Sequence, residues 1–221
     1  KELDAALDAL FYALDHEPSL DGGGQAAFLR ARVHPGLARF KGRLVCDQDF
    51  KPRAAALEAQ GWRVERAVEG RQLPLVMVLP ERQKLLTLHD LARGWDLVAP
   101  GGVLVCCLPN DWGAKRFEAH LAAVTGNKQT ISKSRCRVFW SRKTGASDEA
   151  TLAQWREGCA YQRILEGRFL SRPGIFCWDR VDDGSAILTR HLPEVITGAV
   201  ADFGAGWGYL SDHLLRHHPD I

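Results

Sequence analysis

The stretch Val200–Leu215 reads VADFGAGWGYLSDHLL and runs from an expected apolar strand through three alternating glycines into an expected helix. Gly204, Gly206 and Gly208 remove side chains where a ligand must approach the backbone, and they permit a positive φ. Such a turn between a strand and a helix is typical of a cofactor loop in an α/β domain. It is not the G-x-G-x-x-G of a dinucleotide site, because the third glycine comes one residue early. The alternative is a glycine-rich turn that binds no ligand.

The composition is that of a globular protein, with 221 residues, 46% of them hydrophobic, and a formal net charge of +2. This length suits one large domain or two small ones with a sizeable core. So small a net charge does not itself indicate a nucleic-acid partner, so the local distribution of charge must decide. The N-terminus has no apolar signal region and no segment is long enough to span a bilayer, so we expect neither export nor a membrane.

The cysteines are expected to be reduced thiols of a cytoplasmic protein, because Cys106 and Cys107 lie together in an apolar run where a disulfide framework is not expected. The six are Cys46, Cys106, Cys107, Cys136, Cys159 and Cys177. They form no C-x-x-C pair, so we expect no metal site. His213, His217 and His218 have no Cys, Asp or Glu at matching spacing and are expected on the surface.

Residues 1–145 predict a Rossmann-like α/β domain, because strands alternate with helices. The expected helices are Leu3–Leu14, Pro52–Gln60, Leu85–Val98 and one containing Phe117, Leu121 and Val124. The expected strands are Leu44–Cys46, Val64–Val68, Leu75–Leu79, Val103–Leu108, Gln129–Ser132 and Arg137–Trp140, the last two forming an antiparallel edge hairpin. The turn Cys46–Pro52, after the first expected strand, holds no glycine. This domain therefore has the architecture without a cofactor loop.

A polar segment after Gly145 marks the expected domain boundary, so that 146–221 form a second domain. It should contain a helix from residue 151 through Gln162 and a helix Ala186–Leu192 with Asp183 or Ser185 as its cap. A parallel βαβ unit needs a strand after its helix, and the sequence stops where that strand would begin. We therefore expect a chain that is cut, with its second domain truncated.

Six segments of the chain occur in a fixed order. They are FKP (Phe50–Pro52), LPERQK (Leu79–Lys84), PNDWGAKRFE (Pro109–Glu118), SKSRCRVFW (Ser132–Trp140), RPGIFCWDRVDDGSAIL (Arg172–Leu188) and VADFGAGWGYLS (Val200–Ser211). Together they resemble the bacterial ribosomal RNA guanine-N2 methyltransferases, a small-subunit enzyme and its large-subunit relative. The D-x-G-x-G-x-G pattern from Asp202 also resembles the first motif of class I S-adenosylmethionine-dependent methyltransferases. The resemblance covers nearly the whole chain.

The resemblance implies S-adenosyl-L-methionine as cofactor and the exocyclic N2 of a guanine in ribosomal RNA as methyl acceptor. It also implies a degenerate methyltransferase-type first domain and a second domain that does the chemistry. The expected cofactor-binding residues are Asp202, Phe203, Gly204, Ala205, Gly206, Gly208, Phe176, Asp183, Gly184 and Ser185. The family's ribose-binding acidic residue and its N-P-P motif would fall beyond Ile221. We therefore name no catalytic residue and expect the 221-residue chain to be inactive by itself.

Residues 113–145 hold eight Lys or Arg against one carboxylate, Glu118, with Phe139 and Trp140 interleaved. A basic stretch with aromatic residues favours phosphate contacts and base stacking, so we expect ribosomal RNA or a ribosomal subunit as partner. The expected RNA-binding residues are Lys115, Arg116, Lys133, Arg135, Arg137, Arg142 and Lys143. Arg135 and Arg137 are expected to be exposed. The alternative is a solvated edge hairpin around a buried Trp140.

Two functions from different classes remain open at this point, an RNA methyltransferase and a non-catalytic RNA-binding or folding module with a Rossmann-like fold. The glycine spacing disfavours a nicotinamide oxidoreductase. Asp179, Asp182 and Asp183 precede a helix and are expected to cap it and shape the loop, not to act as acid and base. The target nucleotide and the oligomeric state stay open.

Overall fold

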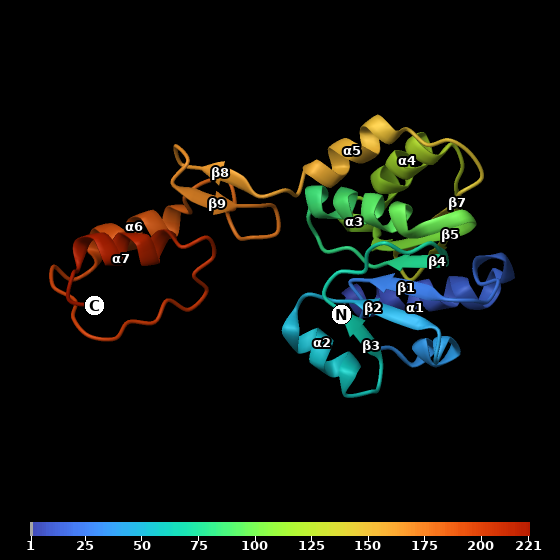
Figure 1. Cartoon of the computed structure of the whole chain (residues 1–221), viewed down its shortest axis with the longest axis horizontal. Coiled ribbons are helices and arrows are strands. Elements are labelled where there is room, and N and C mark those ends of the chain that lie inside the picture. The colour runs from blue at the N-terminus through green and yellow to red at the C-terminus, as the bar shows by residue number, and fades with distance from the viewer. Residues whose placement is uncertain (1) are drawn as a thin grey trace. The chain divides into compact units, whose positions relative to one another are not determined.

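The computed structural model describes residues 2–221 and divides into two compact units, of which the first ends at Glu157 and the second begins at Gly158 (Figure 1). The polar segment after Gly145 leads into helix α5 (Glu149–Glu157), which packs against α3 (Lys84–Leu97). Leu152 and Trp155 of α5 are buried in this contact. The first unit therefore includes a helix that follows the boundary expected from composition.

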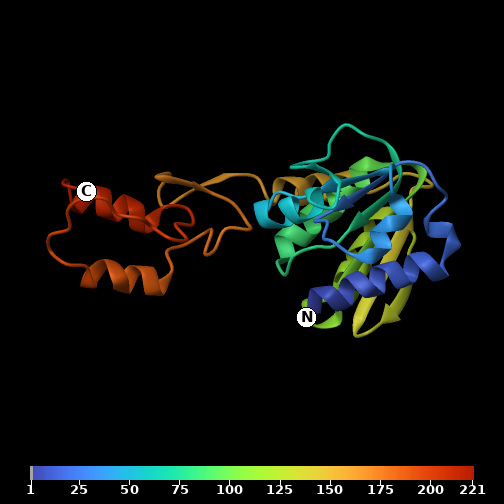
Figure 2. The same ribbon diagram turned by 90° about the horizontal axis from the view of Figure 1, so that it is seen from below.

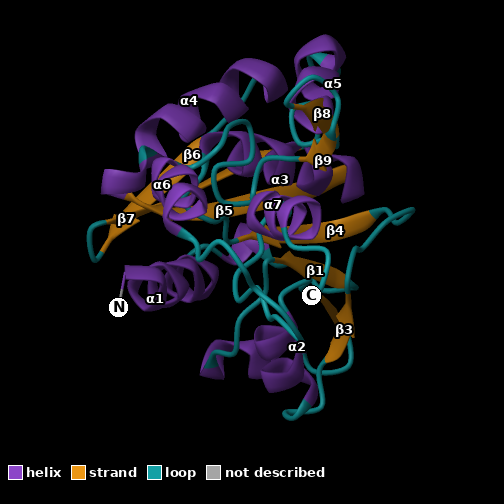
Figure 3. Cartoon of the chain, turned by 90° about the vertical axis from the view of Figure 1, so that its left-hand side faces the viewer, coloured by secondary structure: helices purple, strands orange, loops and turns teal. Residues whose placement is uncertain are grey.

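The first unit is built on a seven-stranded sheet in the order β3-β2-β1-β4-β5-β7-β6 (Figure 3). The strands are β1 (Ala26–Leu29), β2 (Leu44–Asp47), β3 (Arg63–Glu65), β4 (Leu73–Val78), β5 (Val98–Pro109), β6 (Gln129–Lys133) and β7 (Cys136–Arg142). Strands β1 to β5 pair in parallel, whereas β7 is antiparallel to both β5 and β6. The expected α/β class and the antiparallel edge hairpin are confirmed.

Helices cover both faces of this sheet, as Figure 2 shows from a second side. Besides α3 and α5 they are α1 (Glu2–His16), α2 (Lys51–Glu58) and α4 (Ala114–Thr125), with short 3-10 turns η1 (Pro18–Leu20), η2 (Pro35–Phe40) and η3 (Asn110–Trp112). Side chains alternate along β1, so that Phe28 packs with α1 and α2 while Leu29 packs with α3 and α4. The two hydrophobic cores that result hold the sheet between its helices.

The sequence-based prediction missed β1, the strand between β2 and β4 at the centre of the sheet. Its four residues are all buried, so they show no alternation, and the run is too short to stand out. The first expected strand is therefore the second strand of the fold. The turn after β1 also lacks a glycine: Arg30 occupies it with a φ of 59°, and the next glycine is Gly36 in η2.

The second unit contains the antiparallel hairpin β8 (Gln162–Ile164) and β9 (Phe169–Ser171), and the helices α6 (Asp183–His191) and α7 (Tyr209–His217). The expected helix from residue 151 ends at Glu157, and Gln162 begins a strand instead. The next residue is Gly158. Because glycine is a poor helix former, it favours the end of the helix at this point. The helix expected over Ala186–Leu192 is confirmed as α6, and it packs against α7.

Residues 200–203, before the glycine loop, were expected to be a strand and are not one. A strand needs a neighbour to take its backbone hydrogen bonds. Among the described residues, no segment pairs with them. Apolar composition alone therefore did not make this stretch a strand.

Candidate functional site

The three glycines of the loop adopt left-handed backbone conformations, with φ of 82° at Gly204, 59° at Gly206 and 95° at Gly208. A Cβ at Gly204 or Gly208 would meet nothing within 4 Å, and one at Gly206 would only touch atoms at 3.9 Å. The glycines are therefore required by backbone conformation and not by packing within the chain. The space over the loop is open, and a ligand can approach the backbone there.

Asp202 is fixed beside the start of α7. Its Oδ2 accepts a hydrogen bond of 2.7 Å from the Oγ of Ser211, which lies in the first turn of that helix. Gly208 is the N-cap of α7, so the unpaired N–H groups and the positive end of the helix dipole lie at the glycine loop. The loop thus combines donors for an anionic group with a carboxylate for a cationic one. Phe203 and Ala205 between them are exposed.

The structure brings the glycine loop and the PGIF segment together. Trp207, between two of the glycines, donates from its Nε1 to the backbone oxygen of Cys177 at 2.9 Å. A Cβ at Gly206 would lie 3.9 Å from Cγ2 of Ile175. Phe176 stands between Ile175 and Cys177 with 71% of its surface exposed. Sequence reasoning passed over Trp207, and the only signal for it was its position inside the glycine repeat.

Asp182 is the cap of α6, which corrects the expectation of Asp183 or Ser185. Its Oδ2 accepts from the backbone N of Ser185 at 2.9 Å and from the Ser185 Oγ at 3.2 Å. The cap is the residue just before the first helical one, and its side chain reaches the third residue of the helix. Asp183, Gly184 and Ser185 therefore form the first turn of α6. The expectation that one of Asp179, Asp182 and Asp183 caps the helix is confirmed, and the residue is Asp182.

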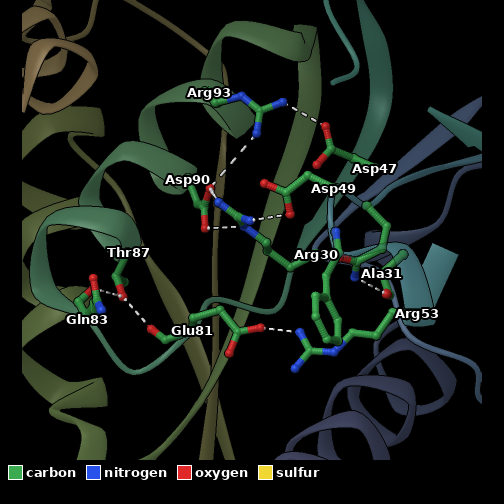
Figure 4. Close-up of polar contacts among 12 residues, drawn as sticks. Arg30, Ala31, Asp47, Asp49, Arg53, Glu81, Gln83, Thr87, Asp90 and Arg93 are labelled. Carbon is green, nitrogen blue, oxygen red and sulfur yellow. Dashed lines mark hydrogen bonds and ion pairs between the residues drawn. The ribbon is translucent and has the colours of Figure 1, made fainter. Parts of the chain in front are cut away.

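In the first unit, charged side chains fill the carboxyl edge of the parallel strands (Figure 4). Arg30, after β1, donates from Nε to Asp90 Oδ2 at 3.1 Å and from Nη1 to Asp49 Oδ1 at 2.9 Å. Arg93 of α3 donates to Asp47 Oδ2, at the end of β2, at 2.6 Å. This edge, between β1 and β4, is the point where strand order reverses and where doubly wound sheets bind ligands.

The charged side chains at this edge form ion pairs with one another. Complete burial raises the pKa of the Asp90 carboxyl, and the adjacent Arg30 guanidinium opposes that rise. Asp47 is also buried, and its Oδ2 accepts from the backbone N of Val68 at 2.8 Å. Glu81 after β4 binds Arg32 and Arg53 in the same way. The edge is therefore closed by ion pairs within the chain.

The basic stretch divides into two groups. Lys115, Arg116, Lys133 and Arg135 are exposed. Arg142 donates to the backbone oxygens of Gly101 and Ser19, Lys143 donates to those of Trp95 and Val98, and Arg137 donates to Glu118 Oε2 at 2.7 Å. These last three side chains tie the edge of the sheet to its surroundings. The first four are accessible to a partner, although Lys133 Nζ also lies 4.5 Å from the centroid of the Tyr12 ring.

Two expectations for this stretch are corrected. Arg137 is not exposed, because its side chain keeps only 24% of its surface and pairs with Glu118, which keeps 3%. Phe139 and Trp140 are both buried, and Trp140 donates from Nε1 to Gln129 Oε1 at 2.7 Å. Neighbouring side chains of β7 point to opposite faces of the sheet, and both faces are covered there. Both rings are therefore buried. Neither ring can stack on a base.

The cysteines and histidines were expected to be reduced core thiols and surface side chains, respectively. None of the six cysteines forms a disulfide among the described residues, and five are buried. His217 is exposed and His213 is half-buried, but His218, just after the end of α7, is buried against the expectation. No group of metal-ligating side chains occurs among the residues that the structure describes. Over the same residues, no helix has the length and apolar character needed to cross a membrane.

Residues 166–221 match the family model of the methyltransferase small domain. The ribosomal RNA small subunit methyltransferase C of Psychromonas ingrahamii is 26% identical over 149 residues, 66% of this chain and 43% of that protein. The protein of that name from Aliivibrio salmonicida is 30% identical over 146 residues, 64% of this chain and 40% of that protein. The chain thus spans less than half the length of these curated relatives.

A solved structure shows the same fold, the 16S rRNA N2 G1207 methyltransferase of T. thermophilus in complex with AdoMet and guanosine. The TM-score is 0.65 at 19% identity, over 84% of this chain and 52% of that one. This likeness, together with the parallel sheet, establishes the Rossmann-like methyltransferase fold. Over about two thirds of its length the chain is thus similar to bacterial ribosomal RNA small subunit methyltransferase C proteins, and its last 56 residues match the methyltransferase small domain.

Proposed function

We propose that the protein carrying this chain is an S-adenosyl-L-methionine-dependent methyltransferase that modifies the exocyclic N2 of a guanine in ribosomal RNA. The observation that carries this proposal is the hydrogen bond from Trp207 to Cys177, which joins the glycine loop to the PGIF segment. The relatives and the solved structure that the chain matches bear the name of such an enzyme. Because the chain spans less than half their length, the activity is proposed for the whole protein.

The second unit would hold the cofactor. The backbone at Gly204 and Gly206, with the N-terminus of α7, suits the methionine carboxylate, and Asp202 suits the cationic amino group. Phe176, beside the Cys177 that Trp207 contacts, and the first turn of α6, from Asp183 to Ser185, are the other residues that we assign to the proposed site. When bound, the cofactor supplies the methyl group. The residues of this chain bind and orient it.

The first unit would hold RNA without binding cofactor. The ion pairs of Arg30, Asp90 and Arg93 occupy the edge where a cofactor would lie. The exposed cations of Lys115, Arg116, Lys133 and Arg135 suit contacts with phosphates, which carry no sequence information. Cysteines that form no disulfide among the described residues agree with a protein of the reducing cytoplasm, where ribosomal RNA is found.

The proposal is tested with the whole protein, labelled S-adenosylmethionine and unmodified small-subunit ribosomal RNA. After digestion, mass spectrometry should find the label in N2-methylguanosine. Label in another nucleoside, or none at all with the folded whole protein, would show that the proposed function is wrong.

A further inference from the structure

We propose that the outer face of the β8–β9 hairpin, formed by Tyr161, Arg163, Leu170 and Arg172, binds single-stranded RNA beside the glycine loop. The inference rests on the proposed function, because it names a further surface for the same RNA. The hairpin lies in the second unit, apart in sequence from the basic stretch of the first (Figure 1). It is therefore a separate contact and can be tested separately.

Strand register defines this face. Arg163 of β8 lies directly opposite Leu170 of β9, and Gln162 lies opposite Ser171. Side chains two apart share a face, so Tyr161 and Arg172 extend the face of Arg163 and Leu170. Tyr161 keeps 64% of its surface exposed and Leu170 keeps 58%. On the opposite face Ile164 is buried, so the outer face is the solvated one.

The charges of the outer face are uncompensated. The Arg172 guanidinium lies 5.0 Å from the centroid of the Tyr161 ring, and Arg163 Nη1 donates to the backbone oxygen of Gly167 at 3.0 Å. Within residues 2–221, neither arginine forms an ion pair with a carboxylate. By contrast, the neighbouring Arg168 pairs with Asp212 at 2.7 Å. Two guanidinium groups without a carboxylate partner, beside an exposed aromatic ring, complement a polyanion with stacking bases.

The hairpin is fixed to the glycine loop through its other face and its turn. Phe169 meets Trp207 edge to face, with ring centroids 4.8 Å apart. The Arg168–Asp212 ion pair links the start of β9 to α7. Both contacts lie next to the loop that would hold the methyl donor. A strand of RNA on the outer face would therefore be held close to that donor, which is the use we infer for the hairpin.

The test measures binding of a fluorescent, unstructured single-stranded RNA oligonucleotide to the 221-residue chain by anisotropy over a range of salt. Replacing both Arg163→Gln and Arg172→Gln should weaken binding about tenfold or more and reduce the slope of log affinity against log salt by about 1.4, at roughly 0.7 per phosphate contact. Tyr161→Ala should weaken binding at least about fivefold, whereas Tyr161→Phe should retain it. Arg180→Gln is the matched control, since Arg180 is also exposed in this unit but pairs with Asp179. Circular dichroism confirms that each variant is folded.

Several outcomes would overturn the inference. Unchanged affinity and slope in the folded double variant would show that RNA does not bind the hairpin. If the arginine variants weaken RNA binding but Tyr161→Ala does not, bases do not stack on the hairpin and the surface only attracts polyanions non-specifically. If these variants lose RNA binding while the whole protein transfers no methyl group, the proposed function fails and the RNA surface stands. If methyl transfer occurs and the variants bind RNA normally, only the inference about the hairpin fails.

Discussion

Arg30 lies directly after the central strand β1 and binds the fully buried Asp90. Among the described residues, the other cationic side chain paired with Asp90 is Arg93, at the longer distance of 3.9 Å. We therefore expect Arg30→Met to lower the free energy of unfolding by about 3 kcal/mol, since an uncompensated buried charge is left behind. Adding Asp90→Leu should restore most of the loss. Urea denaturation measures both, and a double variant less stable than Arg30→Met would contradict the ion-pair account.

Arg137 and Arg135 are two residues apart in sequence but differ in environment. Arg137 binds the buried Glu118, which Lys128 also contacts at 3.2 Å, whereas Arg135 is exposed. Arg137→Ala should cost about 2 kcal/mol, reduced from a full buried pair because Lys128 remains. Arg135→Ala should change stability by less than about 0.5 kcal/mol. Thermal unfolding tests the contrast, and equal losses would mean that Glu118 does not depend on Arg137.

At the scale of elements, His89 of α3 joins α5 by a 3.1 Å hydrogen bond to the backbone oxygen of Arg156. Burial lowers the pKa of His89 below its ordinary value of 6.5, so the folded state favours the neutral ring. The neutral His89 ring therefore contributes fully to the stability of the folded state above pH 6.5. That contribution is lost as the pH falls from 6.5 through the folded-state pKa, because the unfolded chain binds the proton more tightly than the folded chain does. The free energy of unfolding should fall less from pH 7.5 to 5.5 in His89→Gln than in the parent. Parallel pH profiles would show that this histidine is not involved.

Helix α4 presents Lys115 and Arg116 in its first turn, where both are exposed. Removing both charges with Lys115→Ala and Arg116→Ala should reduce the salt slope of RNA binding by about 1.4. All RNA sequences should be weakened alike, because phosphate contacts do not read bases. Arg142→Lys is a useful control, since this residue contacts backbone oxygens of the chain. An unchanged slope would remove α4 from the RNA-binding surface.

Most elements of the first unit were predictable because apolar periodicity and glycine or proline boundaries mark them, as in α3 and β5. The central strand β1 was not, since four buried residues carry no period. The end of α5 at Glu157 was also missed, because Trp155 and Cys159 continue a helical spacing that the backbone does not follow. Local pattern therefore fails where burial on both faces or a short hairpin decides the structure.

At the scale of the whole molecule, the resemblance of the sequence segments indicated which segments belong to the proposed cofactor site. It could not show the contacts that join them, such as Trp207 to Cys177 or Phe169 to Trp207, because these depend on tertiary packing. It also could not distinguish the exposed cations from those that bind the chain itself. The role of Arg30 at the edge of the first unit could not be predicted, because the strand before it, β1, was not recognised.

We expect the glycine loop of the second unit, and not the closed edge of the first, to bind S-adenosylmethionine. Calorimetric titration of the whole protein should give one site per chain, and Gly206→Val should abolish it by placing a β-branched side chain where the ligand meets the backbone. Gly198→Val is the matched control, because Gly198 also has a positive φ, 82°, and open space around it. We expect this control to retain one site. Binding that survives Gly206→Val, or a second site in the parent protein, would contradict the account.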